Sequence, residues 1–130
     1  MREIKFRGKR IDNGEWVHGY YASSPNWGSG IFKIEEKQEN KGYFPFSFIK
    51  IDPKTLGQFT GLKDKNGVEI YEGDITYNMY TEKKSIIEWF EGGFSCVNDK
   101  KAYYIPDYIE IIGNIHENKD LLEDNNGKEE

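Results

Sequence analysis

The sequence predicts an all-β protein built mainly of antiparallel strands. Short apolar segments alternate with polar residues, which is the period of a half-buried strand. Turn signals made of Gly, Asn, Asp and Pro separate these segments at a spacing of roughly 8–12 residues. No amphipathic helix of useful length interrupts them before the C-terminal end. This pattern is typical of a β-sandwich or a small barrel.

The chain opens with a predicted hairpin. Ile4 and Phe6 alternate with charged residues and indicate a first strand. Asp12-Asn13-Gly14 follows, and Asn and Gly favour a tight turn because they tolerate positive φ. Residues 15–21 then form a second strand, with Trp16 among the side chains of one face.

The remaining strands are short and divide the chain into two β-units. We expect strands over residues 31–34, 43–51, 56–60, 68–71, 75–80, 85–90, 94–97, 102–104 and 108–115. Asp52-Pro53 interrupts the pattern, because Pro lacks an N–H and restricts the residue before it. The predicted organisation is an N-terminal β-unit over residues 1–53 and a second unit over 54–116. Residues 117–130 form an acidic, largely flexible tail with room for a short turn of helix. One continuous domain is the alternative.

Aromatic residues are frequent, and aliphatic residues are correspondingly few. The 130 residues include three Trp, nine Tyr and eight Phe. Each buried aromatic side chain removes on the order of 150–250 Å² from water, so a chain of this length can build its core from them. We therefore expect a largely aromatic core.

Charge is unevenly distributed along the chain. The net charge is −5, yet the first ten residues contain five basic residues against one acidic residue. This basic segment is either a solvated strand face or an edge that meets an acidic partner. The candidate partner surface consists of Arg2, Lys5, Arg7, Lys9, Arg10, Trp16 and Trp27. Small barrels also bind single-stranded nucleic acid with such residues, although the sequence pI of about 5.2 opposes phosphate binding.

No combination of residues indicates a catalytic, metal or cofactor site. Cys96 is the only cysteine and lies in a predicted strand, which favours a buried structural thiol. His18 and His116 are far apart, and neither has a second metal ligand nearby in the sequence. Asp64-Lys-Asn-Gly67 is a hairpin turn rather than a calcium loop, because the flanking calcium ligands are missing. No signal peptide or membrane span is apparent, so we expect a cytoplasmic protein.

Three blocks of the sequence together resemble the YopX family of small phage and prophage proteins. The first block is Arg2–Lys9 with Trp16–Gly19, the second is Leu56–Ile75, and the third is Ile111–Asn118 followed by Leu121-Leu122. The resemblance covers nearly the whole chain, and its middle block is the specific one. It implies a phage or prophage product in the bacterial cytoplasm. It also implies a mostly β fold whose C-terminal part, over 54–116, is an SH3-like barrel.

The resemblance supplies no activity and no catalytic residues. The family's pattern positions correspond here to Gly61, Asp64, Gly67, Tyr71, Gly73 and Asp74. We interpret the glycines and aspartates, together with Asn66, as turn residues that determine the fold. Tyr71 is interpreted as a packing residue.

Two classes of function follow from these observations, and an enzyme is a third that we do not favour. The first hypothesis is a non-enzymatic accessory protein that binds a host or phage protein, or a second copy of itself, through a β-surface. The second is a small barrel that binds nucleic acid with its basic N-terminal strand and exposed aromatics. No cofactor is expected in either case.

Overall fold

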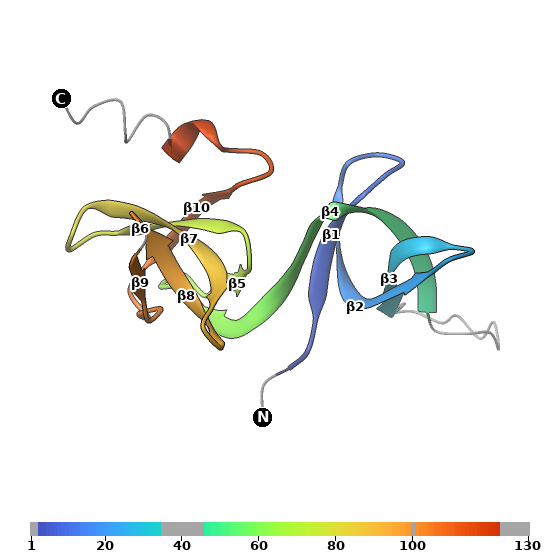
Figure 1. Ribbon diagram of the computed structural model, residues 1–130, viewed down its shortest axis with the longest axis horizontal. Coiled ribbons are helices and arrows are strands. Elements are labelled where there is room, and N and C mark those ends of the chain that lie inside the picture. Colours follow the sequence, from blue (N-terminus) through green and yellow to red (C-terminus); the bar gives the residue numbers. More distant parts are fainter. Residues whose placement is uncertain (1–2, 35–45, 100, 123–130) are drawn as a thin grey trace. The chain divides into compact units, whose positions relative to one another are not determined.

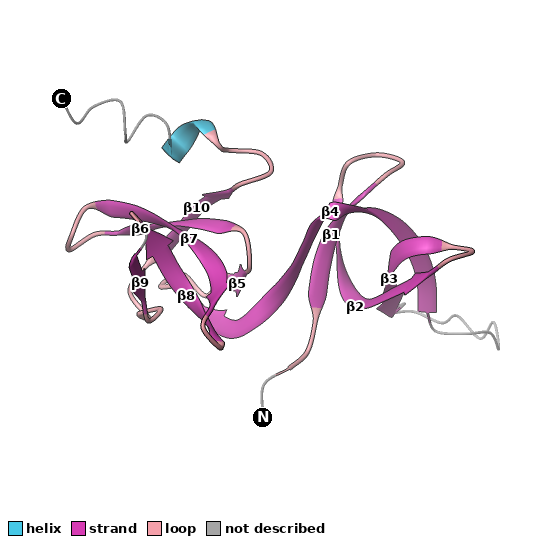
Figure 2. Ribbon diagram, viewed as in Figure 1, coloured by secondary structure: helices cyan, strands magenta, loops and turns pink. Residues whose placement is uncertain are grey.

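The computed structural model describes residues 3–34, 46–99 and 101–122, and within these the chain is almost entirely β (Figures 1 and 2). Two compact units emerge, over residues 1–59 and 60–130. We call them unit 1 and unit 2. The predicted all-β antiparallel class is confirmed. Arg2, the greater part of the tail and residues 35–45 lie outside the described residues. None of the described helices is long and apolar enough to cross a membrane.

The described residues of unit 1 form a closed sheet of four antiparallel strands. These are β1 (Phe6–Arg10), β2 (Trp16–Ser24), β3 (Gly28–Ile34) and the long β4 (Phe46–Lys63). Each pairs with the next, and β4 pairs in addition with β1, which closes the sheet. The first part of β4 pairs with β3, and its later part pairs with β1. The predicted opening hairpin is therefore present, with its turn between β1 and β2.

The expected interruption at Asp52-Pro53 is a bulge within β4 and does not end the strand. On β1 the pairing moves only from Lys9 to Arg7, while on β4 it moves from Asp52 to Gly57. Pro53 is one of the extra β4 residues that have no pairing partner on β1, so its missing N–H removes no hydrogen bond between these strands. Thr55 closes the bulge: its Oγ1 accepts from the Lys9 N–H at 2.8 Å and donates to the Asp52 carbonyl at 2.6 Å. The division between the units accordingly falls later, between Phe59 and Thr60.

The described core is mainly aliphatic, which corrects the expectation of an aromatic core. In unit 1, Val17, Ile31 and Ile51 are buried together. In unit 2, an isoleucine-rich cluster includes Cys96. Phe59 and Tyr71 are the aromatic side chains that are fully buried among the described residues, whereas many others are exposed. Compact β-branched residues fill the narrow space inside small sheets, and the large rings remain outside.

The described residues of unit 2 form six strands and a short helical turn. The strands are β5 (Glu69–Tyr71), β6 (Asp74–Asn78), β7 (Lys83–Phe90), β8 (Gly93–Asn98), β9 (Lys101–Tyr103) and β10 (Glu110–Asn114). Five of them form a sheet in the order β10-β6-β7-β8-β9, and β5 pairs with β4. A helical turn covers 120–122, in agreement with the expected short helix. The SH3-like character of this unit stays a prediction.

The buried carboxylate of Asp64 fastens the β4–β5 turn to the last strand. Its Oδ1 accepts from the N–H groups of Asn66 and Val68, at 2.8 and 2.9 Å. Its Oδ2 accepts from the N–H of Ile111 in β10 at 3.0 Å. Burial raises the pKa of Asp64, but these donors outweigh burial and hold the pKa below its ordinary value. One side chain thus joins two segments that are distant in sequence.

A second tight turn joins β5 to β6. Asp74 is buried, and its Oδ2 accepts from the Tyr71 N–H at 2.7 Å. Gly73 has a φ of 95°, which favours glycine. Its N–H donates to the Ile87 carbonyl at 2.8 Å, and its carbonyl accepts from the Ile115 N–H at 2.9 Å. The turn therefore connects β7 with the segment after β10.

We predict that Asp64→Asn lowers the free energy of unfolding by about 1–3 kcal/mol, because the neutral amide is a weaker acceptor and one of its ends cannot accept. Urea denaturation at pH 7 measures the loss. Asp107→Asn, at an exposed position in the same unit, is the matched control and should have little effect.

The same carboxylate predicts a pH dependence. A folded-state pKa below the ordinary value contributes stability above the unfolded pKa of about 4, and this stability is lost as pH falls through the folded pKa. The gap in unfolding free energy between wild type and Asp64→Asn should therefore shrink on acidification. A gap that stays constant from neutral pH to below pH 3 would contradict this role of the charge.

Gly19 is predicted to be intolerant of any side chain. A Cβ there would lie 2.2 Å from the backbone oxygen of Phe32 on the neighbouring strand. Gly19→Ala should therefore cost about 1–3 kcal/mol, since backbone must move to relieve the contact. At Gly93 an added Cβ would meet no atom within 4 Å, so Gly93→Ala is the control. If Gly19→Ala and Gly93→Ala unfold at the same urea concentration, the predicted intolerance of Gly19 is wrong.

Candidate functional site

A row of aromatic side chains crosses the outer face of unit 1. Tyr20 on β2 lies directly opposite Phe32 on β3, and Phe32 lies opposite Phe48 on β4. The Phe32 and Phe48 ring centroids are 5.0 Å apart, and the Trp27 ring lies 6.0 Å from that of Phe48. We call Tyr20, Trp27, Phe32 and Phe48 the aromatic row. Side chains alternate across a strand, and the neighbouring Ile31 faces the core, so the row faces outward.

The aromatic row is substantially open to solvent. Tyr20 is 50% exposed and Trp27 is 59% exposed. Gly30 gives the Phe48 ring its place, because three ring atoms lie within 2.8 Å of where a Cβ would be. The ring therefore lies flat across β3, which broadens the apolar surface. The exposed rings of Tyr20 and Trp27 make this face the candidate interaction site.

Three of the predicted basic residues lie over aromatic rings. The Arg7 guanidinium lies over Trp16, with 4.6 Å between its Cζ and the ring centroid. The Lys9 ammonium lies 5.8 Å from the same ring. Lys5 instead lies over Phe59, at 5.1 Å. The structure thus brings Arg7, Lys9 and Trp16 together.

Because of these intramolecular contacts, part of the predicted basic surface is already engaged with the protein's own aromatic rings. Arg7 is only 9% exposed, so its guanidinium covers one face of Trp16 and is largely withdrawn from solvent. Cation–π contacts of this kind stabilise by about 0.5–2 kcal/mol. Arg7 and Trp16 therefore act first as structural support for the face.

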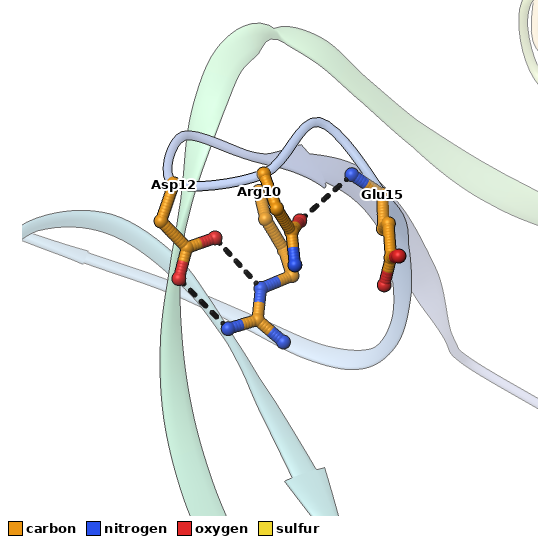
Figure 3. Close-up of polar contacts among 4 residues, drawn as sticks. Arg10, Asp12 and Glu15 are labelled. Carbon is orange, nitrogen blue, oxygen red and sulfur yellow. Dashed lines mark hydrogen bonds and ion pairs between the residues drawn. The ribbon is translucent and has the colours of Figure 1, made fainter.

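Arg10 is engaged in the turn that follows β1, as Figure 3 shows. Its Nε donates to Asp12 Oδ1 at 2.9 Å, and a terminal nitrogen donates to Oδ2 at 2.8 Å. The hydrogen bonds from Arg10 lower the pKa of Asp12, and the same pair raises the pKa of Arg10. This bidentate geometry leaves Arg10 less available to a partner. Trp27 lies apart from the basic residues, within the aromatic row.

The two units carry opposite formal charge. Residues 1–59 contain ten Lys and Arg against seven Asp and Glu, a formal charge of +3. Residues 60–130 contain eight basic against sixteen acidic residues, a formal charge of −8. Although the whole chain has a net charge of −5, unit 1, which carries the aromatic row, has a positive formal charge.

The predicted turn residues all lie in unit 2. Asp64, Asn66, Gly73 and Asp74 form the two turns described above. Gly61 and Gly67 have φ values of 91° and 84°, a region that favours glycine. Each of these residues therefore contributes to the backbone conformation of unit 2.

Sequence reasoning missed Phe32 and Phe48, which it treated as ordinary strand residues. The segment Phe46–Ile51 is apolar on both faces, so its alternation does not say which side is inside. A useful signal was present in Gly30. A glycine within a strand often marks the close approach of another group, here the Phe48 ring.

The side chains considered for chemistry do not assemble into a reactive group. Cys96 is buried, and burial raises the pKa of its thiol, which disfavours the thiolate. In the part of the chain that the structure describes, no three His, Cys, Asp or Glu side chains gather where they could hold a metal ion.

Comparison with known proteins places the chain in a family. The profile of the YopX protein family matches residues 5–123. The crystal structure of protein EF1440 from Enterococcus faecalis is similar over 94% of this chain and 99% of that chain, with 26% identity and a TM-score of 0.54. No curated protein matches. Because the family profile spans most of the sequence, the chain belongs to the YopX protein family.

Proposed function

We propose that this protein is a non-enzymatic, phage- or prophage-encoded accessory protein of the bacterial cytoplasm, and that it binds a protein partner through the outer face of unit 1. The observation that carries the proposal is the solvent-exposed aromatic row. The face consists mainly of aromatic rings and cations, a composition suited to binding.

Exposed aromatic rings favour protein recognition for two reasons. Tyr and Trp bury a large area while few rotatable bonds are fixed, so the entropic cost of binding is low. Trp27 and Tyr20 are the most exposed members of the row and are the expected anchors. Shielding of such anchors from water is what makes a few residues dominate an interface.

The charge of unit 1 favours a host or phage partner with acidic groups around an apolar patch. The exposed Lys50 lies on β4 two positions from Phe48, on the same face, while Lys9 lies over Trp16. Charge complementarity of this kind chiefly speeds association and selects the partner. A second copy of this chain is a further possible occupant, which the test below identifies by mass.

A second candidate function, binding of single-stranded nucleic acid, is favoured by one observation. Aromatic rings beside lysines on a small barrel form the stacking platform that such proteins use. Against it stand the −5 net charge and the withdrawal of Arg7 beneath the face. We therefore rank it below protein binding.

Site-specific photocrosslinking tests the main proposal. A photoreactive phenylalanine analogue replaces Tyr20, with the exposed Tyr104 of unit 2 as the matched control position. In bacteria that carry the prophage, we predict a discrete protein adduct from position 20 that is absent from position 104. Adding Trp27→Ala should reduce its yield about tenfold or more, as expected for an anchor residue.

The mass of the adduct identifies the partner class. An adduct at twice the chain's own mass indicates self-association, and one removed by nuclease indicates nucleic acid. Equal adducts from both positions, or none from position 20, would overturn the proposal.

Tryptophan fluorescence tests the second candidate directly. If the face binds single strands, adding an oligothymidine at low salt should quench Trp27, and affinity should fall steeply as salt rises. Trp27→Phe should abolish most of that signal. We expect instead no change up to about 100 μM oligonucleotide, the upper end of the usual range of non-specific dissociation constants.

A further inference from the structure

A cavity of about 310 Å³ opens into unit 2, independently of the face on unit 1. Side chains from β6, β7 and β8 form its base, and residues 103–108 form one wall. This volume lies at the lower end of the range for small-molecule sites, which is about 300–1,000 Å³. The cavity is therefore suited to a compact ligand.

The base of the cavity is polar, although it is buried. Thr76 on β6 and Ser85 on β7 are directly opposite each other, and they are 2% and 8% exposed. The Asn98 side-chain amide donates to Ser85 Oγ at 2.8 Å. Thr76 Oγ1 donates to the Ser85 carbonyl at 3.5 Å, the outer limit for a hydrogen bond. Thr76 also hydrogen-bonds with the Cys96 thiol, so Ser85 Oγ is the hydroxyl at this base that is left to meet an additional acceptor.

Ser85 is the better-placed donor of the two. Its oxygen accepts a hydrogen bond from Asn98. Among the described residues, its own hydroxyl hydrogen has no hydrogen-bond acceptor. A ligand that lacked an acceptor would bury this hydroxyl without compensation, at a cost of about 1–3 kcal/mol. The base therefore selects a ligand with a carbonyl oxygen or a ring nitrogen at its inner edge.

The walls present aromatic rings. Tyr103, Tyr104 and Tyr108 line the cavity, and Tyr104 is 76% exposed. Tyr80 packs edge-on against Tyr108 with 4.8 Å between centroids, which fixes the Tyr108 ring. Rings at the mouth of a narrow cavity favour a flat guest that can stack.

The charge of unit 2 narrows the class of ligand. Lys83 is the charged side chain in the lining, while unit 2 as a whole has sixteen acidic residues against eight basic ones, which disfavours a polyanion. From the base, the walls and the charge together, we infer that the cavity binds an uncharged planar heteroaromatic ring with acceptors on its edge, of the nucleobase type. This inference does not depend on the proposed protein partner of unit 1.

A titration of the full chain with uridine and with adenosine, followed by two-dimensional amide NMR, tests the inference. We expect saturable shifts at Thr76, Ser85 and Cys96 for at least one nucleoside, with a dissociation constant of about 1 mM or tighter. Cys96 lines the cavity and is the only cysteine, so the bound nucleoside should also slow its alkylation by iodoacetamide. Toluene, a flat ring without any hydrogen-bond acceptor, should bind at least about tenfold more weakly.

Two variants test whether the side chains that line the cavity determine nucleoside binding. Tyr104→Ala changes a highly exposed ring and should leave folding intact while weakening nucleoside binding at least about fivefold. Tyr20→Ala, in unit 1, should leave the affinity unchanged. The inference is overturned if neither nucleoside shifts these signals at about 10 mM. It is equally overturned if toluene binds as tightly as the better nucleoside, or if Tyr104→Ala leaves the nucleoside affinity unchanged.

Discussion

The three hydrogen bonds accepted by the Asp64 carboxylate are the constraint on which unit 2 depends. They fix the β4–β5 turn through Asn66 and Val68 and hold β10 through Ile111. A small sheet has little apolar area to bury, so a single buried charge that satisfies three backbone donors matters more here than in a larger core. The cavity of unit 2 lies within the framework that this turn helps to close.

The distribution of rings is the second consequence of building small sheets. Isoleucine and valine fill the interiors of both units, while Tyr20, Trp27 and Tyr104 remain outside. The molecule thereby keeps two aromatic surfaces that its own folding does not use. One is the face of unit 1 that carries the aromatic row, and the other is formed by Tyr103 and Tyr104 at the cavity of unit 2.

The sequence predicts the fold class and most strands, because alternation and turn chemistry are local. The turns at Asp12–Gly14 and at Asp64–Gly67 are examples. It does not predict which face of Phe46–Ile51 is inside, because both faces are apolar. The contact between Arg7 and Trp16 depends on the register of β1 and β2. The cavity is beyond local reasoning, since its base and wall come from segments far apart in the chain.

The central claim is that the aromatic row lies at the surface of unit 1 and is available to a partner. Photochemically induced nuclear polarisation tests this directly, because it enhances the NMR signals of Tyr and Trp rings only where a dye in solution can reach them. The account predicts strong enhancement for Tyr20 and Trp27 and none for the buried Tyr71. An absence of enhancement at Tyr20 and Trp27 in the isolated protein would contradict it.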